Sequence, residues 1–226
     1  MKKIGIVGGI SWVSTTDYYT LINQGVNEKM GGLNSAEIII YSLNFAELQE
    51  KTWIDCYDLL LHACTYLKKC EVNAIVLAAN TAHLYADRLE AEVQVPIISI
   101  IKETAKHILK HNIKTVGLLG TKFTMQLPFY RSELESSGLK VIVPETQNDI
   151  DFIQDVVRDE LGKGEINAAS KSKIVAIGNT LAKRGAEALI LGCTELPILL
   201  GQEDFTFPVF DTTKIHSNAI VSFIIS

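Results

Sequence analysis

Short runs of apolar, mostly β-branched residues alternate along the chain with longer segments of helical periodicity. The apolar runs predict strands at residues 3–8, 36–42, 74–78, 97–100, 115–120, 139–143, 188–192 and 208–210. The periodic segments predict helices at residues 14–29, 54–70, 81–92, 101–111, 124–137, 147–162, 165–184 and 212–224. Such alternation is typical of parallel sheets whose strands are joined by crossover helices. The pattern therefore predicts the α/β class.

The pattern also repeats within the chain. Residues 73–81 and 187–195 each pass from an apolar run into small residues and then a short polar group. The offset from Ala79 to Cys193 is 114 residues (193 − 79 = 114), and residues 4–8 match residues 116–120 at an offset of 112 (116 − 4 = 112). Two segments with nearly the same offset indicate a duplicated half.

The duplication predicts two lobes, each a parallel sheet flanked by helices. We assign residues 1–100 to the first lobe, joined by residues 211–226, and residues 101–210 to the second. If the halves face each other, Cys193 and Ala79 are symmetry mates in one cleft.

Composition and charge narrow the class of protein. The chain has 226 residues, of which 47% are hydrophobic and 21% charged, with a net charge of −5. No apolar run reaches the roughly 18 residues of a membrane span. The charged start, Met1-Lys2-Lys3, leads into a strand rather than a signal-peptide core. We therefore expect a cytoplasmic protein that binds neither membranes nor, without a basic stripe, nucleic acid.

Four cysteines occur, at positions 56, 64, 70 and 193, and no CxxC pair is among them. The first three fall in or at the ends of one predicted helix and suit buried small hydrophobic positions. We predict no metal site.

Polar residues gather where four predicted strands end. These strand ends are residues 8–15, 79–83, 120–124 and 193–195, and each precedes a helix. Ligands of open α/β sheets bind at the carboxyl ends of strands, where free amides and hydroxyls can bind an anion. Ser, Thr and Asn there are also common helix N-caps. Their matching placement in two halves favours a shared small anionic ligand.

A dinucleotide site does not fit the first turn. Gly5, Gly8 and Gly9 are spaced as GxxGG rather than GxGxxG, and Ser42-Leu43-Asn44 ends the second strand without an acidic residue. No Walker lysine motif occurs either.

Cys193 is the candidate catalytic thiol, because a helix N-terminus lowers the pKa of a cysteine and a thiolate can take a proton from carbon. The alternative is an inert buried cysteine. Glu195 and His216 are candidates to orient or protonate the thiol, or else to cap a helix or pair within the core. His83 is a candidate acid on the opposite turn, or a cap for its own helix.

Taken together, the turn motifs resemble the cofactor-independent aspartate/glutamate racemase family over essentially the whole chain. They are Gly8-Gly9-Ile10-Ser11-Trp12-x-Ser14-Thr15, Asn80-Thr81-x-His83, Gly120-Thr121-x-x-Thr124, Gly192-Cys193-Thr194-Glu195-Leu196 and Asp211-Thr212-Thr213-x-Ile215-His216. The resemblance implies two pseudo-symmetric α/β lobes with the active site between them, and a homodimer without a cofactor. It also implies a two-base mechanism, in which one cysteine removes the α-proton and a second returns it on the opposite face.

The resemblance and the polar turns at the strand ends together indicate which residues contact a small anionic amino acid or carboxylate. The expected substrate-binding residues are Ser11, Ser14, Thr15, Asn80, Thr81, Thr121, Thr124, Thr194 and Lys163. The expected catalytic residues are Cys193, His83, Thr81 and Glu195.

The sequence departs from the family pattern in three respects. Ala79 occupies the place of the first cysteine and cannot carry a proton. The loop at residues 44–51 has no arginine for a distal carboxylate, and Lys163 stands beside the expected lysine position, which falls on Gly162. Val13 replaces a residue that is often polar or acidic.

Three functions remain open from the sequence. The first is an aspartate/glutamate-type racemase in which a water, Thr81 or His83 replaces the missing base. The second is a one-thiol decarboxylase that resembles arylmalonate decarboxylases, where a small residue also fills the first site. The third is a catalytically degenerate protein that binds a carboxylate. Ala79 is either natural or an engineered replacement of a cysteine.

Overall fold

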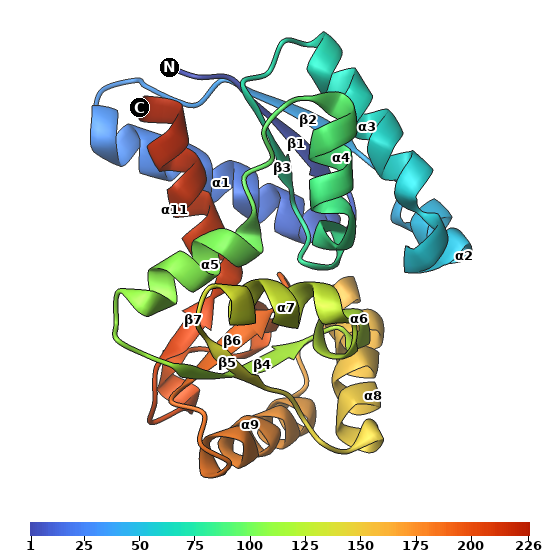
Figure 1. Cartoon of the computed structure of the whole chain (residues 1–226), viewed down its shortest axis with the longest axis vertical. Helices are drawn as coiled ribbons and strands as arrows, with labels where there is room; N and C mark the ends of the chain where they lie inside the picture. Colours follow the sequence, from blue (N-terminus) through green and yellow to red (C-terminus); the bar gives the residue numbers. More distant parts are fainter. The chain divides into compact units, whose positions relative to one another are not determined.

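The computed structural model describes the backbone of residues 1–226 and every side chain except those of Thr52 and Ile54. The chain divides into two compact units, each with its own sheet (Figure 1). The first unit comprises Met1–Ile100 and His216–Ser226, and the second comprises Ile101–Ile215.

The first unit is built on a three-stranded parallel sheet. Its strands, in spatial order, are β2 (Ile38–Ser42), β1 (Ile4–Gly8) and β3 (Ala74–Leu77). One face of the sheet is covered by α1 (Trp12–Met30) and by α11 (Thr212–Ile225) from His216 onward. The two helices contribute Tyr18, Ile22, Ile220 and Ile224 to one apolar core with the strands.

The remaining helices of the first unit follow β2 and β3. α3 packs on the face of the sheet opposite to α1, where Leu67 lies over Gly5 of β1. These elements are α2 (Phe45–Asp55), α3 (Tyr57–Lys69), a 3₁₀ helix (Thr81–Tyr85) and α4 (Ala86–Val93).

The second unit is built on a four-stranded parallel sheet. Its strands, in spatial order, are β5 (Lys140–Ile142), β4 (Thr115–Gly120), β6 (Ala188–Gly192) and β7 (Val209–Asp211). Its helices are α5 (Ile100–Leu109), α6 (Lys122–Gln126), α7 (Pro128–Ser136), α8 (Gln147–Asp155), a π-helical turn (Val156–Glu160), a 3₁₀ turn (Leu161–Lys163), α9 (Ala168–Lys183), α10 (Leu196–Leu199) and a 3₁₀ turn (Gln202–Asp204). Figure 1 shows α7 and α9 on opposite faces of this sheet. The predicted α/β class with two parallel, helix-flanked sheets is confirmed.

The internal repeat extends to individual hydrogen bonds. In the first unit the amide of Lys3 donates to Asn73 Oδ1 at 2.7 Å, and the amide of Asn73 donates back to the Lys3 carbonyl at 2.7 Å. In the second unit the amide of Thr115 donates to Glu187 Oε2 at 2.7 Å, and the amide of Glu187 donates back to the Thr115 carbonyl at 2.8 Å. The same reciprocal pair of hydrogen bonds therefore joins the starts of β1 and β3 in the first unit and of β4 and β6 in the second.

A second matched pair lies where each helix returns to its sheet. Glu90 accepts the amide of Ile97 at 2.8 Å, and Gln202 accepts the amide of Val209 at 2.9 Å. Both acceptors are side-chain oxygens seven residues before the amide. The two units therefore share connections as well as strand order.

Two strand glycines allow equivalent helices to approach. A Cβ on Gly5 would lie 2.9 Å from Leu67 Cδ2, and one on Gly117 would lie 3.0 Å from Leu181 Cδ1. Each glycine faces a buried leucine of the helix that precedes the neighbouring strand. A side chain at either position would force that helix away from the sheet.

The strand predicted at residues 97–100 is wrong. Only an isolated bridge pairs Ile97 with Ile75, and α5 already begins at Ile100. The equivalent segment of the second unit, β7, continues for three residues from Val209.

Several predicted helices have different limits. The helix predicted at 54–70 is two helices that meet at Cys56, and the first of them begins at Phe45. The helix predicted at 124–137 breaks at Leu127, whose ψ of 147° is extended because Pro128 follows it. The segment predicted as one helix at 147–162 passes from α8 into π-helical and 3₁₀ turns.

Candidate functional site

The turn after β6 places a buried thiol beside a carboxylate. The Cys193 side chain is 4% exposed, and its Sγ donates a hydrogen bond to Glu195 Oε2 at 2.9 Å. The Thr194 hydroxyl donates to the same oxygen at 2.9 Å. One carboxylate oxygen therefore accepts two hydrogen bonds, from a thiol and from a hydroxyl.

The pKa of Cys193 is raised well above the ordinary value of a thiol. Burial is the largest cause, and the negative charge of Glu195 and its hydrogen bond add to it. The backbone amides of Glu195 and Leu196 lower the pKa, as expected at a helix start, but α10 has only four residues and their effect is smaller. The sequence-based expectation of a lowered pKa is therefore wrong, and Cys193 is a thiol at neutral pH.

The turn after β4 lies beside this thiol. Gly120 of β4 pairs with Gly192 of β6. The residues that follow these glycines, Thr121 and Cys193, therefore leave neighbouring strand ends. A Cβ on Gly120 would lie 2.7 Å from the Gly192 carbonyl oxygen, which shows how closely the two strand ends approach. The structure thus brings the polar ends of β4 and β6 together, as the sequence predicts for the second half.

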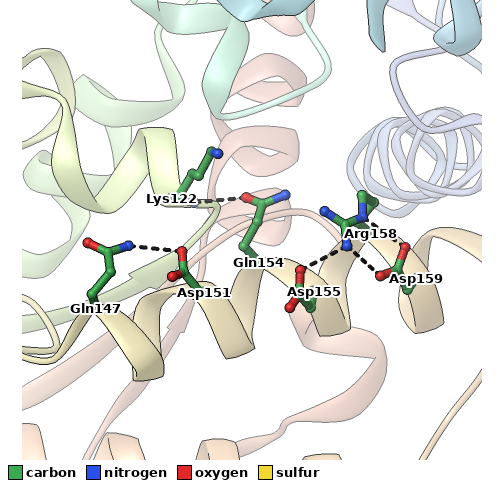
Figure 2. A network of polar contacts seen from close by, with 7 residues as sticks. All are labelled: Lys122, Gln147, Asp151, Gln154, Asp155, Arg158 and Asp159. Carbon is green, nitrogen blue, oxygen red and sulfur yellow. Dashed lines mark hydrogen bonds and ion pairs between the residues drawn. The ribbon is translucent and has the colours of Figure 1, made fainter.

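Thr121 caps α6 and pairs with a second hydroxyl. Its Oγ1 accepts the amide of Thr124 at 3.3 Å and lies 3.2 Å from Thr124 Oγ1. The next amide, that of Lys122, donates to Gln154 Oε1 at 2.9 Å (Figure 2). Gln154 comes from α8, 32 residues further along the chain, and no local sequence pattern reveals that it occupies this amide.

Another residue that the sequence does not reveal is Tyr130 of α7. Its side chain is fully buried, burial raises its pKa, and a charge on Cys193 would raise that pKa further. Tyr130 of α7 therefore lies near enough to Cys193 for a charge on the sulfur to act on its hydroxyl.

The turn after β1 in the first unit is fixed by its own hydroxyls. Ser11 caps α1 by accepting the amide of Ser14 at 3.4 Å. The Thr15 hydroxyl donates to the Ser11 carbonyl at 2.7 Å and accepts the amide of Gly9 at 2.9 Å. Gly9 has a φ of 77° and lies against Leu43, so only glycine fits. Thr15 thus fixes the turn, and its part in substrate binding stays a prediction.

The turn after β3 contains Ala79, Asn80 and Thr81, all of them buried. The neighbouring His83 places Nδ1 3.0 Å from the Ala79 carbonyl oxygen and Nε2 3.1 Å from the amide nitrogen of Ile100. A carbonyl only accepts and an amide only donates, so Nδ1 carries the hydrogen and Nε2 accepts. Burial lowers the pKa of His83 to about 4, and the neutral ring has no nitrogen left for a substrate.

Both ring nitrogens of His216, on α11, are also hydrogen-bonded within the protein. Its Nε2 donates to the Ile98 carbonyl at 2.7 Å, and its Nδ1 accepts the hydroxyl of Tyr18 at 2.8 Å. Burial lowers its pKa to about 3, and the neighbouring ring of His83, 5.9 Å away, contributes to this shift. His216 therefore connects α11, α1 and the chain before α5 within the first unit.

Lys163 is exposed at the end of a 3₁₀ turn, and its role toward a carboxylate stays a prediction. Arg158 on the preceding turn is held by Asp155 at 2.8 Å and by Asp159 at 2.6 Å (Figure 2). Among the described side chains, no group of three or more His, Cys, Asp and Glu could hold a metal ion. No helix in the described chain is long and apolar enough to cross a membrane.

Comparison with known proteins identifies the class. The family model described as Asp/Glu/Hydantoin racemase matches residues 7–220, and the chain belongs to this family. The chain is similar to the crystal structures of a candidate Asp/Glu racemase from Yersinia pestis (38% identity, TM-score 0.92) and of an aspartate racemase homologue from Pyrococcus horikoshii OT3 (37% identity, TM-score 0.85). Both similarities cover 100% of each chain.

A curated relative is similar over nearly the same extent. The broad specificity amino-acid racemase RacX of Bacillus subtilis is 26% identical over 97% of this chain and 96% of its own length. The resemblance inferred from the turn motifs is thereby confirmed.

Proposed function

We propose that the chain is an isomerase that moves the α-proton of aspartate, glutamate or a related amino acid, with Cys193 as the acid/base. The observation that carries the proposal is the thiol–carboxylate pair of Cys193 and Glu195 at 2.9 Å. Family membership supports the same class of reaction.

The pair suits proton transfer at carbon. The thiol proton of Cys193 passes to Glu195 Oε2 while the sulfur takes the hydrogen of the substrate Cα–H bond, whose electrons remain on carbon as a carbanion. In the return step the sulfur gives a proton back to carbon and recovers one from Glu195. Because the pKa of Cys193 is raised, its sulfur acts as a base only while Glu195 takes the thiol proton, and the thiolate that forms is strongly basic.

The hydroxyl-bearing turns suit the substrate carboxylate. Thr121 and Thr124 follow β4, Thr194 follows Cys193 in the turn after β6, and the ends of the two strands are paired. Hydroxyl and amide donors aimed at the carboxylate would stabilise the charge that develops as the α-proton leaves. That Ser11, Ser14, Asn80 and Thr81 contact the same substrate stays a prediction from the internal repeat.

Inversion needs a proton donor on the second face of the carbanion. Ala79 offers only a methyl group, and both ring nitrogens of His83 are bound to backbone groups. A water or the Thr81 hydroxyl is then the remaining donor. We therefore expect exchange of the α-proton on one face to be faster than inversion.

Ala79 also favours a second candidate, a one-thiol decarboxylase of the arylmalonate type. In that reaction a carboxylate leaves as carbon dioxide, its bonding electrons form an enolate, and Cys193 supplies one proton to it. A single thiol is sufficient for this reaction. A degenerate protein that only binds carboxylates is the third candidate.

One experiment separates the three. The protein is incubated in deuterated water with each enantiomer of aspartate and glutamate, and with substituted malonates. Deuterium at Cα supports the isomerase, carbon dioxide release supports the decarboxylase, and binding without either reaction supports the third candidate. Cys193→Ser should abolish both reactions, whereas Cys70→Ser, at a partly exposed cysteine outside the turn, should abolish neither.

A further inference from the structure

A basic groove lies along the outer edge of β5 in the second unit. It has a volume of about 350 Å³, and its lining includes Arg131, Lys140, Glu145 and Arg184. Three positive charges and one negative charge therefore line one hollow. Its size is at the lower end of the range for small-molecule sites.

The two arginines reach the groove from opposite faces of the sheet. Arg131 lies on α7 and Arg184 directly follows α9, and these helices cover the two faces (Figure 1). Arg131 Nη2 donates to the Val141 carbonyl at 3.4 Å, and Arg184 Nη1 donates to the Val143 carbonyl at 2.8 Å. These bonds anchor both guanidinium groups at the strand edge.

The same bonds disfavour an added β-strand as the occupant. An incoming strand would have to pair with the outward-facing carbonyls of β5 and of the residue that follows it, and the arginines already occupy those of Val141 and Val143. An ionic ligand can use the remaining N–H groups without breaking these bonds, since each guanidinium has five.

The present carboxylate partners leave charge in the groove unneutralised. Arg184 Nη2 lies 2.9 Å from Glu145 Oε1, but the Glu145 side chain is 71% exposed. Arg131 Nε is 3.6 Å from Glu135, at the edge of ion-pair range, and both side chains are about half exposed. Exposed pairs of this kind contribute little energy and are readily replaced by a ligand with more charge.

We propose that this groove binds the phosphate group of a small phosphorylated ligand. The oxygens of a carboxylate lie in one plane and suit one guanidinium, whereas phosphate directs its oxygens tetrahedrally. A phosphate can therefore accept from Arg131, Arg184 and Lys140 at once, with charge-assisted bonds. In doing so it displaces Glu145 from Arg184.

The test is titration of the full chain with inorganic phosphate and with glycerol 3-phosphate, by calorimetry at constant ionic strength. Saturable binding of either ligand is expected, and comparison of the two shows whether an ester group is accepted. Arg184→Gln and Arg131→Gln should each weaken binding about tenfold or more. Glu145→Gln should strengthen it about three- to fivefold, because it removes the competing carboxylate.

The matched control is Arg158→Gln, since Arg158 is an exposed arginine of the same unit that is held by two aspartates outside the groove. It should leave the affinity unchanged. The absence of saturable phosphate binding would overturn the proposal, as would equal affinity in Arg184→Gln and Arg158→Gln. Binding of an acidic extended peptide but of neither phosphate would also overturn it, in favour of a docking edge. The gain in Glu145→Gln tests the site even if an arginine variant does not fold.

Discussion

Oε2 of Glu195 lies 2.9 Å from Sγ of Cys193, and burial together with the charge of this carboxylate keeps the sulfur protonated. The same carboxylate can also accept the proton of the thiol. A residue that opposes thiolate formation in the resting protein is thus the one that would accept the proton during turnover.

Replacement of Glu195 by Gln should separate these two effects. The neutral amide removes a negative charge beside the sulfur, so the pKa of Cys193 should fall, although burial still raises it. The amide cannot take up the thiol proton, so exchange of the substrate α-proton should fall about 100-fold or more. Alkylation of the Cys193 peptide against pH reports the pKa, and deuterium incorporation reports the exchange.

The control is Glu203→Gln, an exposed carboxylate of the same unit, which should change neither quantity. An unchanged exchange rate in Glu195→Gln would show that the carboxylate only packs against the thiol.

Acid should destabilise the fold through His83 and His216. Their pKa values are lowered to about 4 and about 3, whereas an unfolded histidine titrates near 6.5. The unfolded state binds more protons in this range, so the stabilisation is complete above about pH 6.5. It is lost as pH falls toward 4 and 3, at about 1.4 kcal/mol per pH unit for each ring. Urea unfolding from pH 7 to pH 4 measures the slope.

His83→Gln should reduce that slope, because the amide side chain does not titrate. The variant should also be less stable at pH 7 by about 1–3 kcal/mol, since Ala79 and Ile100 lose a buried partner. His62→Gln, at an exposed histidine of the same unit, serves as the control and should keep the wild-type slope. Equal slopes in all three proteins would contradict the assignment of a neutral His83.

Much of the architecture could be predicted because its signals are local. Apolar runs mark the strands, and the glycines and hydroxyls after them mark the turns at Ser11, Thr121 and Cys193. The contacts that the sequence does not predict join residues that are far apart along the chain. The Lys122 amide is bound by Gln154, and His216 joins Tyr18 to Ile98, although nothing near these residues indicates it. The lowered Cys193 pKa that the helix start predicts is wrong, because burial and the charge of Glu195 outweigh two favourable amides.

The matched glycines give a test of the internal repeat. Gly5→Ala and Gly117→Ala should each destabilise the fold by about 1–3 kcal/mol, because the new methyl group meets Leu67 or Leu181 in a closely packed interior. Urea unfolding measures both. Combination with Leu67→Val or Leu181→Val, respectively, should recover part of the loss, and failure of this rescue would place the strain elsewhere.

Ala79 allows a direct test of the missing base. Ala79 lies in the turn after β3, and Cys193 follows the corresponding strand β6 of the second unit. Ala79→Cys would supply a second thiol for the return of the proton. If Ala79 limits inversion, the rate of inversion relative to α-proton exchange should rise about tenfold or more. Ala79→Ser is the matched control, since a hydroxyl of similar size is a far weaker acid/base. Circular dichroism follows inversion, and proton NMR in deuterated water follows exchange.

An unchanged ratio in Ala79→Cys, with exchange intact, would show that position 79 does not face the reacting carbon. Loss of both reactions in Cys193→Ser, together with such a result, would leave one-thiol chemistry as the better account.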